Sequence, residues 1–363
     1  MPSYQKELEV AIKAVRRASI LTANVQSRVI ANKSSSTITK SDASPVTVAD
    51  YAAQAIVINA LKCSFPCDEI VAEESSDGLS DDFLNLILNE INENAPKPED
   101  VSLCNKEYPL SSTKNVAEII NNGGSKGGSQ GRFWCLDPID GTKGFLRGQQ
   151  FAVCLALIEN GKVQLGCVGC PNLKLNDFDD DDDATLTTGK KYEDPEKYGY
   201  IFYAITDEEK AYYVETLERG NNRPQVIEPH ANAVTDFSKM ISVEGVEKTH
   251  SSHDKQDIIK SELGINKSVH LDSQVKYCLL ALGLGHVYLR LPIKMDFEEK
   301  IWDHAAGNAL VRAVGGCHTS SLSDEPLDFS KGRTLKTKGV IASVIPANLH
   351  SKIVASAKKA ILG

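Results

Sequence analysis

The chain has 363 residues, 41% of them hydrophobic, which allows a sizeable core and two domains and argues against a largely disordered protein. Its formal net charge of −9 argues against a polymeric nucleic acid as partner, which would require a basic face, but not against a small anionic ligand. No secretory signal is evident, and the longest apolar stretch is interrupted by His286 and Arg290. We therefore expect a cytoplasmic protein without a membrane span, with its 9 cysteines as reduced thiols.

Helical periodicity dominates the first part of the chain. Apolar residues recur at intervals of three and four between residues 8 and 29, which predicts a long amphipathic helix. A second helix is expected over residues 48–61. It places Asp50 in its first turn, where the positive end of the helix dipole favours a carboxylate.

Strands follow, and two of them end at acidic residues. The first delivers Glu73 at its end and the second delivers Asp137. Two further apolar runs flank Asn160-Gly161, a dipeptide typical of a two-residue hairpin turn. The predicted strands are residues 70–72, 132–136, 151–158 and 162–168.

After about residue 236 the pattern changes to alternating short strands and helices. A helix beginning at Gln274 is expected to be capped by Ser273, and another is expected to run from Trp302 to the glycines at 315 and 316. We place a domain boundary near residue 235, with the functional site in the seam between the halves. The expected strands are 240–243, 269–271, 287–291 and 340–344, and the last helix is 346–361.

The most informative motif is DPIDGT at residues 137–142. Asp137 and Asp140 lie on a turn that Pro138 stiffens and Gly141 permits, so both carboxylates can face one point. A single aspartate here would usually be a turn or helix cap. However, Glu73-Glu74 upstream and WDHAAG at 302–307 downstream add further acidic groups. Such a cluster repels itself unless it binds a multivalent cation, and oxygen ligands suit Mg²⁺.

Two other segments are interpreted as loops. The Gly/Ser-rich stretch at 121–131 lacks the Gly-Lys-Ser/Thr ending of a phosphate-binding P-loop. The five aspartates at 179–183 lack the alternating spacing and closing glutamate of a calcium site, so a solvated loop is favoured.

The acidic motifs resemble the lithium-sensitive, Mg²⁺-dependent phosphatase superfamily that includes inositol monophosphatase. The chain is further similar to the fungal 3′(2′),5′-bisphosphate nucleotidase branch, nearly throughout, with weaker similarity at about 75–130 and 172–198. The branch motifs are SPVTVADY (44–51), GRFWCL (131–136), GFLRG (144–148), EGVEK (244–248) and SSHD (251–254).

The resemblance implies an α/β fold arranged as a layered αβαβα sandwich. Residues 1–235 would form an α+β domain with a mostly antiparallel sheet and most of the metal ligands. Residues 236–363 would form an α/β domain with the nucleotide contacts and Asp303.

The resemblance also implies two or three Mg²⁺ ions. One would be held by Glu73, Asp137 and the backbone carbonyl of Ile139. A second would be held by Asp137, Asp140 and Asp303, and a third, weaker ion would lie near Glu73. Inhibition by Li⁺, and by Na⁺, would follow from a monovalent ion in a metal position.

The resemblance assigns the remaining site residues as follows. Asp50 and Thr142 would orient and deprotonate the attacking water, although Asp50 alone also fits a helix-start charge. Substrate contacts would come from Thr142, His250, Ser273, Lys276 and Arg290. Taken singly, the last four read as a surface histidine, a helix cap and two exposed charges.

The implied activity is removal of the 3′-phosphate from adenosine 3′,5′-bisphosphate to give AMP, and also action on 3′-phosphoadenosine 5′-phosphosulfate, in sulfate assimilation. The partner would be a small anionic nucleotide, and the protein a monomer. An inositol (poly)phosphate phosphatase is the alternative, since the metal motifs are shared. The long segment before Asp137 and residues 244–254 favour the nucleotidase. A non-catalytic nucleotide sensor is disfavoured because all the metal carboxylates are present.

Overall fold

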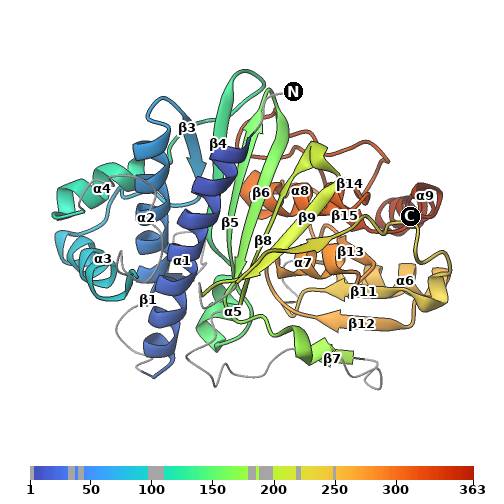
Figure 1. The fold of residues 1–363 in the computed structure, drawn as a ribbon. Helices are drawn as coiled ribbons and strands as arrows, with labels where there is room; N and C mark the ends of the chain where they lie inside the picture. Colours follow the sequence, from blue (N-terminus) through green and yellow to red (C-terminus); the bar gives the residue numbers. More distant parts are fainter. Residues whose placement is uncertain are drawn as a thin grey trace.

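The structure is a computed structural model that describes residues 4–31, 37–39, 45–96, 110–178, 185–187, 199–217, 222–247 and 251–363 (Figure 1). His250 and the five aspartates at 179–183 lie outside the described residues. In the part of the chain that is described, no helix is both long enough and apolar enough to cross a membrane.

A seven-stranded sheet forms the centre of the molecule, with the order β10-β9-β8-β6-β5-β4-β3. It is antiparallel except for β3, which runs parallel to β4. Asn160 and Gly161 have φ of 50° and 74° and join β5 to β6, so the expected two-residue hairpin turn is confirmed. The strands are β3 (Glu69–Ala72), β4 (Arg132–Asp140), β5 (Ala152–Glu159), β6 (Lys162–Cys170), β8 (Tyr200–Ile205), β9 (Lys210–Glu215) and β10 (Gln225–Ile227).

Helices cover one face of this sheet (Figure 1). The expected helices are confirmed as α1 (Gln5–Ala31) and α2 (Val48–Ser64). Alanines on both helices are fully buried, which lets the helices approach each other and the sheet closely. Outside them lie α3 (Asp81–Asn94) and α4 (Thr113–Asn121), and β1 (Thr37–Thr39) pairs with β2 (Pro45–Thr47).

The opposite face packs against α7 (Val275–Leu282) and α8 (Ala305–Ala313). These helices also contact a second, mixed sheet of six strands in the order β14-β15-β13-β11-β12-β7. Its far side packs against α6 (His253–Leu263) and α9 (Ala347–Leu362). The strands are β7 (Thr185–Thr187), β11 (Ile241–Glu244), β12 (Lys267–His270), β13 (Val287–Arg290), β14 (Cys317–Ser320) and β15 (Val340–Ser343). The layers confirm the αβαβα sandwich.

Some boundaries differ from the sequence expectations. Trp302 lies in a short 3₁₀ turn, Ile301–Asp303, and the helix itself begins two residues after Asp303. The strand expected to end before Asp137 continues to Asp140. The boundary near residue 235 falls between the last strand of one sheet and the first long strand of the other, but β7 joins the second sheet from the first half. The division into two domains stays a prediction.

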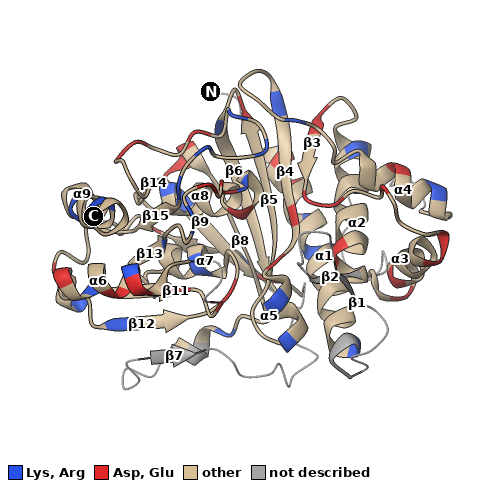
Figure 2. Cartoon of the chain, turned by 180° about the vertical axis from the view of Figure 1, so that it is seen from behind, with Lys and Arg blue, Asp and Glu red and all other residues tan. Residues whose placement is uncertain are grey.

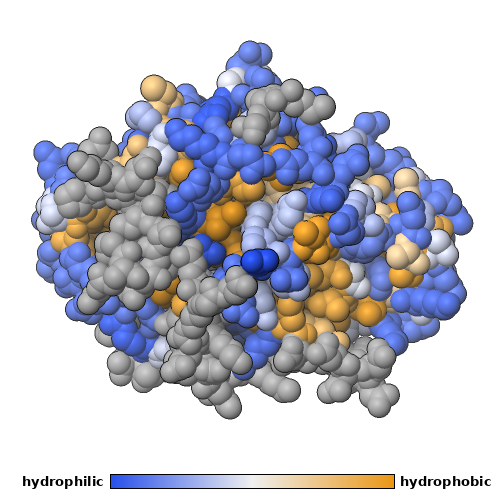
Figure 3. Space-filling model, in the orientation of Figure 1, coloured by the Kyte–Doolittle hydropathy of each residue, from blue (hydrophilic) through white to orange (hydrophobic). Residues whose placement is uncertain are grey.

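Charged side chains are spread over the surface. Figure 2 shows Lys and Arg scattered among Asp and Glu rather than gathered on one element. In Figure 3 hydrophilic side chains dominate the face shown, with apolar side chains in patches between them.

Gly166 in β6 provides a test of the packing between the central sheet and α8. A Cβ at this position would lie 2.4 Å from the carbonyl oxygen of Ala306 and 2.8 Å from Cβ of Ala309. Gly166→Ala should therefore lower the free energy of unfolding by about 1–3 kcal/mol, measured by urea denaturation. Gly245→Ala is the control, because its Cβ would meet no atom closer than 4.0 Å. Equal stabilities of the two variants would contradict the tight helix–sheet contact.

Candidate active site

A cavity of about 1290 Å³ lies between the two sheets and gathers most of the predicted site residues. It is lined by Glu73, Asp137, Ile139, Asp140, Thr142, Ser273, Lys276, Arg290 and Asp303. Asp50 does not line it, but is buried at the start of α2, close enough to act electrostatically on Asp137. Residues more than two hundred positions apart in the sequence therefore share one space.

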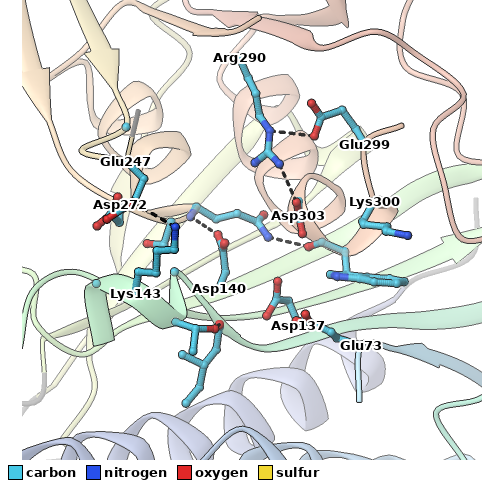
Figure 4. Close-up of a pocket in the computed structure, with 18 of the residues that line it drawn as sticks. Glu73, Asp137, Asp140, Lys143, Glu247, Asp272, Arg290, Glu299, Lys300 and Asp303 are labelled. Atoms are coloured by element: carbon cyan, nitrogen blue, oxygen red, sulfur yellow. Dashed lines mark hydrogen bonds and ion pairs between the residues drawn. The ribbon is translucent and has the colours of Figure 1, made fainter. Parts of the chain in front are cut away.

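An irregularity in β4 explains why two aspartates three residues apart face the same cavity. In a regular strand, side chains separated by an odd number of residues point to opposite faces. Asp137 pairs with Cys154, whereas Asp140 pairs with Ala152, so β4 contains one extra residue between the two pairs. Such a bulge redirects a side chain. Figure 4 shows Asp137 and Asp140 directed into the same region, with Asp303 opposite them.

Asp137 is buried within the acidic cluster, with too little positive charge beside it. Asp137 is 2% exposed, and its Oδ1 has no hydrogen-bond partner among the described residues. Burial, together with the charges of Glu73, Asp140 and Asp303, raises the pKa of Asp137 well above its usual value. Burial and Asp303 raise the pKa of Asp140 to about 7. A buried, unpaired carboxylate oxygen in such a cluster fits a hard divalent cation.

The turn after β4 is fixed by close contacts. Gly141 has φ 88°, and a Cβ there would lie 3.0 Å from Cβ of Ser273. Thr142 follows, and its hydroxyl donates to the carbonyl oxygen of Ile139 (3.3 Å). A hydrogen bond between Thr142 and Asp50 is not among those that the structure shows for the described residues. The water-activating pair thus stays a prediction.

Of the predicted basic residues, Lys276 is buried and Arg290 is partly buried. Lys276 is 6% exposed, donates to the carbonyl oxygen of Leu271 (3.3 Å), and lies 5.2 Å from the ring centroid of Tyr288. Burial lowers the pKa of Lys276. Arg290 donates from Nη2 to Asp303 Oδ2 (3.0 Å), and its Nε lies 2.8 Å from Glu299 Oε2. The interpretation of these two residues as exposed charges is therefore wrong.

Ser273 and Gln274 connect the two halves of the site. Ser273 has φ 69°, and its hydroxyl accepts from the amide of Val275 (3.3 Å). The helix begins at Val275 and its N-cap residue is Gln274, so the expected cap at Ser273 is wrong by one residue. The backbone N–H of Gln274 donates to Asp140 Oδ2. The side chain of Gln274 donates to the carbonyl of Trp302 (2.7 Å) and accepts from the amide of Gly307 (2.9 Å). Gln274 was missed, because an isolated glutamine at a helix start carries no sequence signal.

Glu299, Asp303 and His304 offer ligand atoms within 4.8 Å of one another, a spacing that a metal ion could use. In the structure, Arg290 bridges the two carboxylates of this group, as Figure 4 shows. The guanidinium thus already supplies positive charge there. The uncompensated charge lies instead on the β4 side, at Asp137.

Arg333 is a second basic residue that the sequence analysis missed. Its guanidinium donates to the backbone carbonyls of Ala72 (2.5 Å), Gly123 (3.3 Å) and Ser125 (3.0 Å), and lies 4.8 Å from the ring of Trp302. It thereby ties the end of β3, which presents Glu73, to the segment that presents Asp303. Only the fold brings these partners together, and no motif marks Arg333.

Ion pairs close the opposite rim of the cavity. Lys143 pairs with Glu247 (3.3 Å), and Arg147 pairs with both Glu247 and Asp272. These contacts join α5 (Thr142–Arg147) to the loops after β11 and β12. The similarity noted at GFLRG and EGVEK therefore falls on two segments that touch.

Comparisons with known proteins agree with this geometry. The model of the inositol monophosphatase family matches residues 3–362. The 3′(2′),5′-bisphosphate nucleotidase 1 of Candida albicans is 45% identical over 358 residues, covering 94% of this chain and 92% of the relative. The 3′(2′),5′-bisphosphate nucleotidase of Emericella nidulans is 41% identical, with coverage of 98% and 99%.

Solved structures show the same fold. An IMPase of Thermotoga maritima has a TM-score of 0.57 at 18% identity, with 99% of each chain covered. CysQ from Bacteroides thetaiotaomicron has a TM-score of 0.54 at 20% identity, with 94% of this chain and 97% of that chain covered. The resemblance seen in the motifs is confirmed over nearly the whole length, and this chain belongs to the inositol monophosphatase family.

Proposed function

We propose that this protein is a Mg²⁺-dependent 3′(2′),5′-bisphosphate nucleotidase, which hydrolyses the 3′-phosphate of adenosine 3′,5′-bisphosphate to AMP and phosphate. The observation that carries the proposal is the bulge in β4, which turns Asp137 and Asp140 into one cavity with Glu73 and Asp303. Relatives that are 41–45% identical over most of the chain and are named bisphosphate nucleotidases support the substrate class.

Glu73, Asp137, Asp140, Asp303 and the carbonyl of Ile139 would hold two or three Mg²⁺ ions. When bound, such ions offset charge on the phosphoryl oxygens, stabilise the leaving group and favour a nucleophilic water. The chain itself orders these ligands. The β4 bulge directs Asp137 and Asp140 into the cavity, and the backbone N–H of Gln274 donates to Asp140. Li⁺, and Na⁺, would inhibit by taking a metal position with less charge.

The far wall of the cavity would bind the nucleotide. Lys276 and Arg290 supply positive charge for the phosphates, and Ser273 lies at a helix start that suits an anion. Thr142 and His250 complete the proposed contacts. The same site would accept 3′-phosphoadenosine 5′-phosphosulfate. We place the enzyme, as a monomer, in the cytoplasm and in sulfate assimilation.

Metal dependence is the first test of this function. Asp140→Asn keeps an oxygen acceptor for the Gln274 amide but removes a charge, so it should weaken Mg²⁺ binding and lower turnover by about 10²-fold or more. Mg²⁺ titration calorimetry and phosphate release from adenosine 3′,5′-bisphosphate measure both. Asp207→Asn, which changes an exposed aspartate outside the cavity, is the control. Full activity of the wild type in excess chelator would contradict the proposal.

Substrate recognition gives a second prediction. Arg290→Ala would leave the buried Glu299 without its cationic partner. Lys276→Gln is therefore the variant to test. Loss of this charge should raise KM by a factor equivalent to about 1.5–3 kcal/mol, the net value of a hydrogen bond to a charged group. The assay compares nucleotide bisphosphates with inositol phosphates, and Lys352→Gln on the exposed surface of α9 is the control. An unchanged KM, with a wild-type preference for inositol 1-phosphate, would point to the alternative phosphatase.

Water activation gives a third prediction. Asp50→Asn and Thr142→Val should each leave most of the nucleotide affinity, because the other proposed contacts supply it. Each should slow the chemical step by roughly 10²–10⁴-fold, the usual contribution of a positioned base. Because each group would work through the other, the losses should not multiply in the double variant. Single-turnover kinetics of the three variants measures this. A double variant that loses the full product of the single effects would make Asp50 a helix-start charge only.

A further inference from the structure

A chain of buried polar side chains runs from the active site into the core, and no part of the proposed mechanism uses it. His304 contacts Glu299 through Nε2 (3.3 Å) and the hydroxyl of Tyr277 through Nδ1 (2.7 Å). The same hydroxyl contacts His318 Nε2 (3.1 Å), and His318 Nδ1 contacts Asn308 Nδ2 (3.3 Å). All five residues are less than 5% exposed, so bulk water does not supply their hydrogen bonds.

The direction of these hydrogen bonds can be deduced from the inner end. The amide nitrogen of Asn308 only donates, so His318 Nδ1 must accept and His318 Nε2 carries the proton. Burial pushes the pKa of His318 well below its usual value, so this ring is neutral. His318 then donates to the oxygen of Tyr277, which is left to donate its own proton to His304 Nδ1. His304 consequently carries its proton on Nε2 and donates to Glu299.

The outer end leads to the same assignment. Although burial alone would raise it, Arg290 and His304 hold the pKa of Glu299 below its usual value. Glu299 is therefore ionised and can only accept, so His304 Nε2 must be its donor. Both ends of the chain require a proton on His304 Nε2. Every hydrogen bond from Asn308 to Glu299 then has one donor and one acceptor.

Close packing holds this chain in place. A Cβ on Gly307 would lie 2.1 Å from a ring carbon of Tyr277, so only glycine lets α8 pack this closely against the tyrosine. Glu299, in turn, faces Arg290, whose other end contacts Asp303. Its two partners, His304 and Arg290, fix the orientation of the Glu299 carboxylate. Glu299 in turn orients the guanidinium of Arg290 toward Asp303, a proposed metal ligand.

We propose that His304 and Glu299 are positioning residues, which act through this hydrogen-bonded chain to fix Arg290 against Asp303. Neither residue needs to touch the substrate. The expected change in kcat/KM rests on the proposed function. The position of the histidine protons and the ordering of Arg290 do not, because they are properties of the protein alone. It also gives a role to three residues of the WDHAAG motif: Asp303 as ligand, His304 as donor and Gly307 as the site of close approach.

The wild-type chain is tested first by ¹⁵N NMR with labelled histidine and arginine. We expect a proton on Nε2 of both His304 and His318, and a slowly exchanging Nε–H of Arg290. A His304 ring without a proton on Nε2, which has no donor for Glu299, would overturn the proposal. This measurement requires no variant and no substrate, so it stands even if the enzyme hydrolyses another phosphate ester.

A pair of substitutions then separates positioning from packing. The amide of glutamine reaches the place of a histidine Nε2, whereas that of asparagine reaches the place of Nδ1. His304→Asn should therefore lose the donor to Glu299, broaden the Arg290 Nε–H signal and lower kcat/KM by about 10–100-fold, as removal of partners of metal ligands does. His304→Gln should retain the signal and most of the activity.

The control is His350→Gln. His350 is also buried, but it contacts Ser343 (2.7 Å) and Thr319 (2.8 Å) rather than the chain of side chains that ends at Glu299. It should lose stability without losing the Arg290 signal or the activity of the folded enzyme. Equal kinetic and NMR effects of His304→Asn and His304→Gln would overturn the positioning role. If the His304 variants do not fold, Tyr277→Phe replaces them, because it removes only one hydroxyl. Loss of the Arg290 Nε–H signal in this variant supports the proposal, and retention of the signal overturns it.

Discussion

The burial of like charge at the end of β4 is the constraint on which the rest of the site depends. Asp137 and Asp140 face one cavity with Glu73 and Asp303, and burial and mutual repulsion raise the pKa of both β4 aspartates. Without a cation, these carboxylates favour protonation, which costs the site its negative charge near neutral pH. The site is thus arranged for a positively charged occupant. Other interactions hold the carboxylates in place against their mutual repulsion.

These other interactions are hydrogen bonds from residues outside the acidic cluster. Gln274 contacts Asp140 and the segment that bears Asp303, and Arg333 contacts three backbone carbonyls beside Glu73. Each of them spans the two halves of the site. The carboxylates are therefore held by neighbours rather than by one another, and mutual repulsion does not spread them apart.

The sequence predicted the long and periodic elements well. α1, α2 and the β5–β6 hairpin were identifiable because their signals are local: a helical period and an Asn-Gly turn. β14 and the strands β8 to β10 were not predicted, because no turn motif or acidic motif beside them marked their positions. The acidic site residues were identifiable because their motifs are compact. Only the structure brings together Gln274, Glu299 and Arg333, since each acts through a partner from another element.

The three-residue strand β7 ties the first half of the chain to the second sheet. It lies within the first half of the chain but pairs in parallel with β12, where it covers the edge of the second sheet. A fragment beginning near residue 236 would keep all the other strands of that sheet and expose the β12 edge. Unpaired edges promote association between chains. The second half, made alone, is therefore expected to pair with itself through β12, so that its solubility depends on a segment cut away with the first half.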